Sequence, residues 1–211
     1  MSKIAILVTG ASGMLLPARL LAAVAGLASV ERLHLVVSQG AAKVLRHECG
    51  GPERESATAI LAAAEVRGNA RERIVVHDDR ALDAAISSGS YRLDATIVLP
   101  CSSGTLGAVA NGTAKTLIQR ACLVALKERW PLLLGFRETP LSLMHIENMR
   151  RVTYAGATVV PPMPAFYVGD GASLAESGLE RFLDAYVLRV LDLAGLAATA
   201  ASDLRWEGES R

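Results

Sequence analysis

Short apolar runs alternate along the chain with longer segments of helical composition. The runs are rich in Val, Ile and Leu, which is typical of strands buried on both faces of a sheet. Strands that alternate with helices at this spacing predict a parallel sheet covered on both faces. Six strands are expected, over residues 3–9, 33–37, 73–77, 95–99, 131–136 and 158–160.

The segments between these runs predict the helices. We expect helices over residues 17–27, 41–49, 57–66, 106–110, 114–127, 141–154 and about 174–193, and a further helix that starts at residues 82–86. Gly178 marks the start of the regular part of the last one. No repeat or linker divides the chain, so the prediction is one doubly wound α/β domain, flavodoxin-like or Rossmann-like, over residues 1–196, followed by a tail at residues 197–211.

Composition limits the cellular compartment and the kinds of partner that the protein can have. Hydrophobic residues make up 51% of the chain, yet no apolar run is long enough to span a bilayer and the first residues lack a signal-peptide layout. We therefore expect a cytoplasmic homo-oligomer whose apolar surplus lies in subunit contacts. A net charge of +1 gives no electrostatic case for nucleic acid or an anionic membrane. The three cysteines have no CxxC spacing, which favours a reducing compartment.

Two opposite charges end the buried run at residues 131–136. Arg137 and Glu138 stand where a turn residue would be usual, and they are followed by Thr139 and Pro140. The carboxyl edge of an open α/β sheet is where ligands bind. The alternative is a solvated ion pair at a strand end.

Two turns rich in small residues follow other strands. GASG at residues 10–13 follows the first strand and opens a helix, a layout that aims backbone N–H groups at a phosphate. It is not GxGxxG, so a dinucleotide is not indicated, and a tight turn without a ligand is the alternative. PCSSGT at residues 100–105 follows the fourth strand. Its hydroxyls can cap a helix or bind a ligand, and capping explains one of them but not all.

Several short stretches occur in the order found in one family. Together they resemble the UbiX-type flavin prenyltransferases, over residues 3–206. The stretches are GASG (10–13), SSGS (87–90), PCS…TL (100–106), LKER (126–129), RETPL (137–141), PPMPAFY (161–167) and RVLD (189–192).

The resemblance implies a reaction. Such a protein binds FMN between the subunits of a homododecamer and transfers a dimethylallyl group from dimethylallyl monophosphate to N5 and C6 of reduced FMN. It does so without a metal, and the product, prenylated FMN, serves a UbiD-type decarboxylase.

The resemblance also implies the site residues. Ser12, Glu138 and Lys127 are the expected catalytic residues, with Ser12 and Glu138 matching residues that handle protons. The isoprenoid phosphate is expected against Lys127, Tyr167 and Arg189, with Arg120 nearby. FMN contacts are expected at Gly10, Ala11, Ser12, Ser38, Ser102, Ser103, Gly104, Thr105 and Arg137.

The residue types suit this chemistry. When an allylic C–O bond breaks without a metal, the charge on the leaving phosphate must be met by fixed cations. Lys127, Arg189 and Arg120 are cations of that kind, and a Tyr167 hydroxyl adds a donor. Each cation alone could equally belong to a solvated helix face.

Two rival functions remain, and the chain departs from the family in places. The family usually has Lys where this chain has Gly104, and Tyr-Gly where it has Leu16-Pro17. A flavin-dependent cysteine decarboxylase of the same fold group would need a catalytic His and a PASANT-type motif, and the turn here is PCSSGT. A flavin-binding or flavin-delivery protein without catalysis would not need Lys127, Glu138, Tyr167 and Arg189. The four histidines lack metal spacing and are expected to be ordinary core or surface residues.

Overall fold

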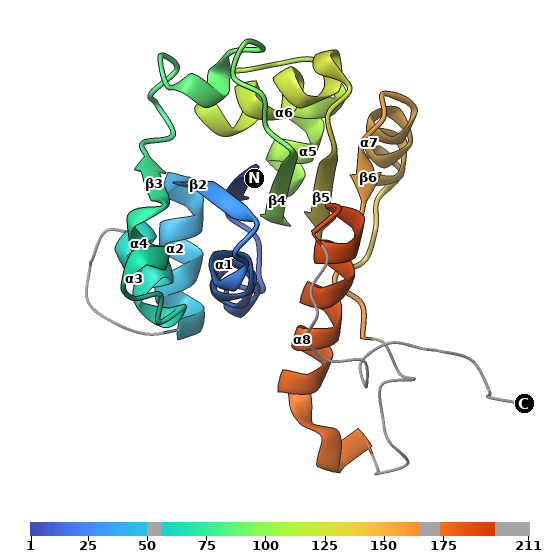
Figure 1. The fold of residues 1–211 in the computed structure, drawn as a ribbon. Coiled ribbons are helices and arrows are strands. Elements are labelled where there is room, and N and C mark those ends of the chain that lie inside the picture. Colours follow the sequence, from blue (N-terminus) through green and yellow to red (C-terminus); the bar gives the residue numbers. More distant parts are fainter. Residues whose placement is uncertain (50–55, 165–173, 197–211) are drawn as a thin grey trace, which may run out of the picture.

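Six parallel strands form a single sheet in the order β3-β2-β1-β4-β5-β6 (Figure 1). The computed structural model describes residues 1–49, 56–164 and 174–196. All six expected strands are confirmed, and no strand end differs from the expected one by more than three residues. Their bounds are β1 (Ser2–Val8), β2 (Val30–Val37), β3 (Ile74–His77), β4 (Ala95–Cys101), β5 (Leu132–Phe136) and β6 (Thr158–Val159).

Helices cover both faces of this sheet, as the sequence predicts. Alternate residues of β1 point to opposite sides: Ile4 and Ile6 join one hydrophobic cluster, and Ala5 and Leu7 join the other. The first cluster includes α1 (Leu15–Gly26), α2 (Gln39–Cys49), α3 (Ser56–Ala63) and α8 (Leu174–Leu193), with α4 (Asn69–Glu72) at its edge. The second includes α5 (Ser103–Ala110), α6 (Leu117–Glu128) and α7 (Leu143–Tyr154).

The strand order reverses between β1 and β4. From β1 the chain steps outward through β2 to β3, then returns to β4 and steps outward on the other side through β5 to β6. Such a switch point leaves a crevice at the carboxyl ends of the two central strands. Buried Thr9 joins these ends, because its hydroxyl donates to the Pro100 carbonyl at 2.9 Å and accepts from the Ser102 N–H at 2.7 Å.

Some expected elements differ from those observed. The helix expected from residues 82–86 is wrong: only a 3-10 turn, Ala85–Ser87, forms there. Ile86 is the one residue of this turn that is buried in the hydrophobic cluster with α6. The Asp78 carboxylate, which accepts from the Arg80 N–H, holds the preceding residues in a turn. The short α4 was not expected. Gly178 has φ 65° and ψ 160°, so the expectation that regular helix starts there is confirmed.

Two expectations concern residues that are not described. The expected tail, residues 197–211, lies outside the described residues, and so does Tyr167. The single domain over residues 1–196 stays a prediction. Of the helices in the described ranges, none has the length and apolar character needed to traverse a bilayer.

Candidate ligand site at the switch point

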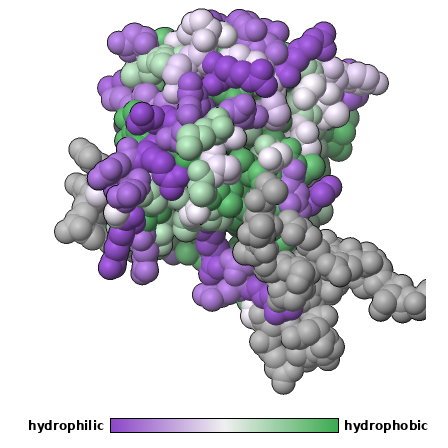
Figure 2. Space-filling view, viewed as in Figure 1, coloured by the Kyte–Doolittle hydropathy of each residue, from purple (hydrophilic) through white to green (hydrophobic). Residues whose placement is uncertain are grey.

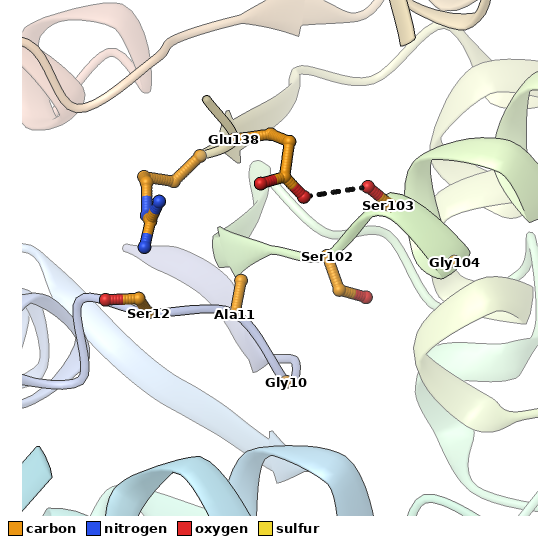
Figure 3. Close-up of a pocket in the computed structure, with 8 residues that line it drawn as sticks. Gly10, Ala11, Ser12, Ser102, Ser103, Gly104 and Glu138 are labelled. Carbon is orange, nitrogen blue, oxygen red and sulfur yellow. Dashed lines mark hydrogen bonds between the residues drawn. The ribbon is translucent and has the colours of Figure 1, made fainter. Parts of the chain in front are cut away.

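A polar pocket of about 360 Å³ opens at the carboxyl edge of the sheet (Figure 3). Three segments distant in sequence form its walls: the turn after β1, the turn after β4, and the two charged residues after β5. This is the size range of small-molecule sites. The residues lining it are Gly10, Ala11, Ser12, Ser102, Ser103, Gly104, Arg137 and Glu138. Seven of the nine residues expected to contact FMN therefore lie together, with Glu138 beside them.

The turn after β1 depends on close backbone contact. A Cβ atom at Gly10 would lie 2.8 Å from the carbonyl carbon of Gly40 and 3.0 Å from its oxygen. Only a residue without a side chain fits there unless the backbone moves. Gly40 lies in the first turn of α2, so this contact sets the distance between the β1–α1 turn and α2.

The turn after β4 caps helix α5 and leaves the pocket wall at Gly104 open to a ligand. Ser102 is the N-cap of α5, and its hydroxyl accepts from the Thr105 N–H at 3.3 Å. Thr105 is buried within this cap and does not line the pocket. Gly104 is exposed, and a Cβ atom there would meet nothing within 4 Å. A ligand can therefore approach the first turn of α5, whose N–H groups have no partners within the helix.

Glu138 is exposed in the single chain, and its two carboxylate oxygens are both engaged. Oε1 accepts from the N–H of Thr139 at 3.2 Å, and Oε2 accepts from the Ser103 hydroxyl at 3.4 Å, the contact drawn in Figure 3. The turn after β4 therefore orients the carboxylate, although the side chain of Glu138 is exposed.

Glu48 of α2 is a site residue that sequence reasoning missed. Its carboxylate accepts from the N–H groups of Gly13 at 3.0 Å and Met14 at 2.8 Å, and it bonds the Ser12 side chain. Burial alone would raise the pKa of Glu48, but these bonds and the nearby charge of Arg137 lower it below its ordinary value.

The sequence held one indirect signal of this acceptor. Helix α1 has Met14 at its N-cap, no side-chain cap and no acidic residue in its first turn. Its N–H groups therefore need an acceptor from elsewhere. Glu48 takes the N–H groups of Met14, the N-cap, and of Gly13 before it. The expected use of this turn as a phosphate cradle would therefore place two negative charges together.

Ser38, the remaining expected FMN contact, does not line the pocket. Its hydroxyl accepts from the Ala41 N–H at 3.1 Å and so caps α2. It lies beside the Gly10–Gly40 contact, because a Cβ atom at Gly40 would be 3.8 Å from the Ser38 hydroxyl.

The three cations expected to hold the phosphate, all of them among the described residues, do not gather within one chain. Arg120 and Lys127 lie on α6 and Arg189 lies on α8, which cover opposite faces of the sheet. Arg120 is half-buried and donates to the Ser87 carbonyl at 3.0 Å, whereas Lys127 is exposed and paired with Glu128. Arg189 is exposed, and none of these cations lines the pocket.

Comparison with known proteins gives consistent matches. A family model described as Flavoprotein matches residues 1–180. The flavin prenyltransferase UbiX of Deinococcus radiodurans is 44% identical over 191 residues, 90% of this chain and 87% of that protein. The crystal structure of AnUbiX (PadA1) in complex with FMN and dimethylallyl pyrophosphate has a TM-score of 0.80 and 38% identity, covering 99% of both chains.

Two further structures mark the range of this similarity. A dodecameric FMN-dependent UbiX-like decarboxylase from Escherichia coli O157:H7 has a TM-score of 0.80 and 37% identity, covering 98% of this chain and 100% of that one. The FMN-dependent cysteine decarboxylase TvaF has a TM-score of 0.60 at 16% identity, covering 92% of this chain and 99% of that one. That second likeness is one of fold alone.

Proposed function

Because the chain belongs to the Flavoprotein family and, within it, to the UbiX-type flavin prenyltransferases, we propose that its switch-point pocket holds FMN as the acceptor of a dimethylallyl group. The protein is an enzyme, a flavin prenyltransferase. The proposal for this pocket rests on one observation: the GASG turn after β1, the PCSSGT turn after β4 and Arg137–Glu138 after β5 line the same cavity.

The residues of the pocket fit a flavin mononucleotide. The Arg137 guanidinium offers donors to ring carbonyls, ring nitrogens and phosphate, and the side chains of Ser12, Ser102 and Ser103 add polar hydroxyl groups to the lining. The open wall at Gly104 lets a planar ring or a phosphate reach the start of α5. When bound in its reduced form, FMN supplies the nucleophilic ring atoms N5 and C6.

The side chains of the enzyme then have three tasks. Arg137 and the two turns bind and orient the acceptor. N5 and C6 of the acceptor each lose a proton as they bond to the dimethylallyl group, and Glu138, assisted by Ser12, takes up a proton released in this way. Cations meet the charge on the phosphate as the allylic C–O bond breaks and the electron pair leaves with it. We propose fixed Lys and Arg side chains for this last task rather than a metal ion, so a chelator should leave the rate unchanged.

These cations come from neighbouring copies of the chain. Lys127 and Arg189 are exposed on opposite faces of one protomer, and only another copy can bring such residues to a pocket that they do not line. Apolar side chains exposed at the start of α7, next to the pocket, support an assembly: Leu143 is 78% exposed and Met144 is 67% exposed. Figure 2 likewise shows hydrophobic residues open to solvent among hydrophilic ones. A homododecamer is proposed because a similar solved protein is dodecameric.

The donor, the recipient and the compartment complete the proposal. The donor is dimethylallyl monophosphate, with the diphosphate as the alternative suggested by the AnUbiX complex. The product passes to a UbiD-type decarboxylase. The compartment is the cytoplasm, which suits the three free cysteines, Cys49, Cys101 and Cys122.

One mass measurement tests the function. FMN is reduced in the presence of the protein without oxygen, dimethylallyl monophosphate or the diphosphate is added, and the flavin is analysed by mass spectrometry. A flavin heavier by one prenyl unit is expected with the monophosphate. Unmodified flavin with both donors, from protein that binds FMN, would instead support a flavin-delivery protein without catalysis.

A further inference from the structure

A chain of hydrogen bonds links the start of α7 to Glu138. Nε2 of His145 lies 2.9 Å from the Ser103 hydroxyl, and that hydroxyl lies 3.4 Å from Oε2 of Glu138. His145 does not line the pocket and, as an ordinary core or surface residue, had no expected role. It therefore reaches the pocket through Ser103.

The surroundings of His145 fix the direction of each bond. Its Nδ1 lies 3.2 Å from the backbone N–H of Ser142, which can only donate. Nδ1 must therefore carry the lone pair, and the neutral ring has its hydrogen on Nε2. The Ser103 oxygen accepts this hydrogen, so the hydroxyl proton of Ser103 is left to point at Glu138.

The ring of His145 is held in place from several sides. The Ser142 hydroxyl accepts from the His145 N–H at 3.3 Å, which completes a capping box at the start of α7. The ring centroid lies 5.5 Å from that of Phe136, a buried residue at the end of β5. The Nε2–H donor is therefore pre-positioned toward Ser103.

Helices α5 and α7, which carry Ser103 and His145, also pack directly against each other. The two helices are close at Gly107 of α5, where a Cβ atom would lie 3.5 Å from the Asn148 amide nitrogen of α7. Arg151 of α7 donates to the side-chain oxygen of Asn111 at 2.8 Å. The separation of Ser103 and His145 is thus set by helix packing and not by a flexible loop.

From this geometry we propose that His145 and Ser103 are positioning residues for proton transfer at Glu138. His145 orients the Ser103 hydroxyl, and Ser103 donates to Glu138 and so holds one carboxylate oxygen in place at the pocket. One proton moves in the step, from the acceptor to the Glu138 carboxylate. This inference rests on the proposed function, in which Glu138 takes up that proton.

The length of the Ser103–Glu138 contact suits a site that tightens around its ligand. At 3.4 Å it exceeds the roughly 2.7 Å typical of an O–H···O bond. Catalytic hydrogen bonds in ligand-free proteins are often long and shorten in the complex. Within the described residues, the other charged side chain that lines the pocket is Arg137, beside Glu138. Glu48 of α2 does not line it, but the charge of Arg137 helps to lower the pKa of Glu48.

The test compares variants of the FMN-loaded enzyme by a readout that requires no turnover. The absorption spectrum of bound oxidised FMN is titrated with acid, and the transition due to Glu138 is identified by its loss in Glu138→Gln. In Ser103→Ala the carboxylate loses a donor, so it binds a proton more readily and the midpoint should rise by about half a pH unit. Ser103→Thr keeps the hydroxyl and His145→Gln keeps a donor, so both should stay near the wild-type midpoint.

Ser142→Ala is the matched structural control. It removes the hydroxyl half of the capping box but leaves Nδ1 of His145 facing the Ser142 N–H, so it should lower the melting temperature without moving the midpoint. If Ser103→Ala does not fold, His145→Leu tests the other link and should also raise the midpoint.

The outcomes separate this inference from the proposed function. An unchanged midpoint in Ser103→Ala and His145→Leu, or a transition that survives Glu138→Gln, would overturn the inference. Failure of wild-type enzyme to prenylate FMN would overturn the function, whatever the titration shows.

Discussion

Gly10 offers the sharpest test of how the pocket is built. Replacing it by Ala places a methyl carbon 2.8 Å from the Gly40 carbonyl carbon and 3.1 Å from its Cα. Ordinary carbon contacts begin near 3.5 Å, so the two backbones must separate by about 0.7 Å. Overpacking of this kind costs about 1–3 kcal/mol. The same shift displaces Ala11 and Ser12, so FMN affinity should fall by at least about tenfold, or about 1.4 kcal/mol.

Gly104→Ala is the matched control on the opposite wall of the pocket. The substitution is the same, but the new methyl group meets nothing within 4 Å and lies in the first turn of α5. Its unfolding free energy should be unchanged or higher by up to about 1 kcal/mol, because Gly is a poor helix former. Urea unfolding at one fixed protein concentration measures both variants, and fluorescence titration of FMN measures the affinity of Gly10→Ala. A Gly10→Ala protein as stable as Gly104→Ala, with wild-type FMN affinity, would refute the argument from close backbone contact.

Three further predictions concern single polar groups. Glu138→Gln should bind FMN as wild type does but slow prenylation by about 100-fold, measured as prenylated flavin formed per minute; a wild-type rate would remove Glu138 from the mechanism. Glu48→Gln should lower the free energy of unfolding by about 0.5–1 kcal/mol at pH 7. Because folding lowers the pKa of Glu48, its contribution to stability is present above its unfolded-state pKa and is lost as the pH falls through its folded-state pKa. The unfolding free energies of the wild type and Glu48→Gln, measured in urea, should therefore converge in acid. A difference that stays constant with pH would contradict this. Tyr186→Phe should cost about 1–3 kcal/mol in the same melts, because the buried hydroxyl donates to the Val160 carbonyl at 2.6 Å; equal stability would show that the carbonyl finds another donor.

The sheet could be predicted from the sequence because each strand is recognisable from its own run of apolar residues. Residues 3–9 and 95–99 are rich in β-branched residues, and the order of strands and helices limits the topology. The same reasoning places the turns at Gly10 and Ser102 on one edge of the sheet, which is where the pocket lies. The 3-10 turn at Ala85–Ser87 was missed because its composition suits a helix while its tertiary contacts hold it in a turn.

Contacts between distant side chains could not be predicted in this way. Glu48 reaches Met14 across 34 residues, and His145 reaches Ser103 across 42, and neither spacing has a sequence pattern. The positions of Lys127 and Arg189 relative to the pocket were beyond sequence reasoning for another reason. They lie on opposite faces of the sheet, so whether they meet at a pocket is decided by how copies of the chain assemble.

The most direct test of a site shared between copies is a distance in a crystal structure of the assembled enzyme with FMN and dimethylallyl monophosphate. We predict that Lys127 Nζ lies within about 4 Å of a phosphate oxygen, with Arg189 and Tyr167 beside it and more than one copy of the chain contributing. A donor bound over the flavin in the switch-point pocket, with all three side chains out of contact in every copy, would contradict it.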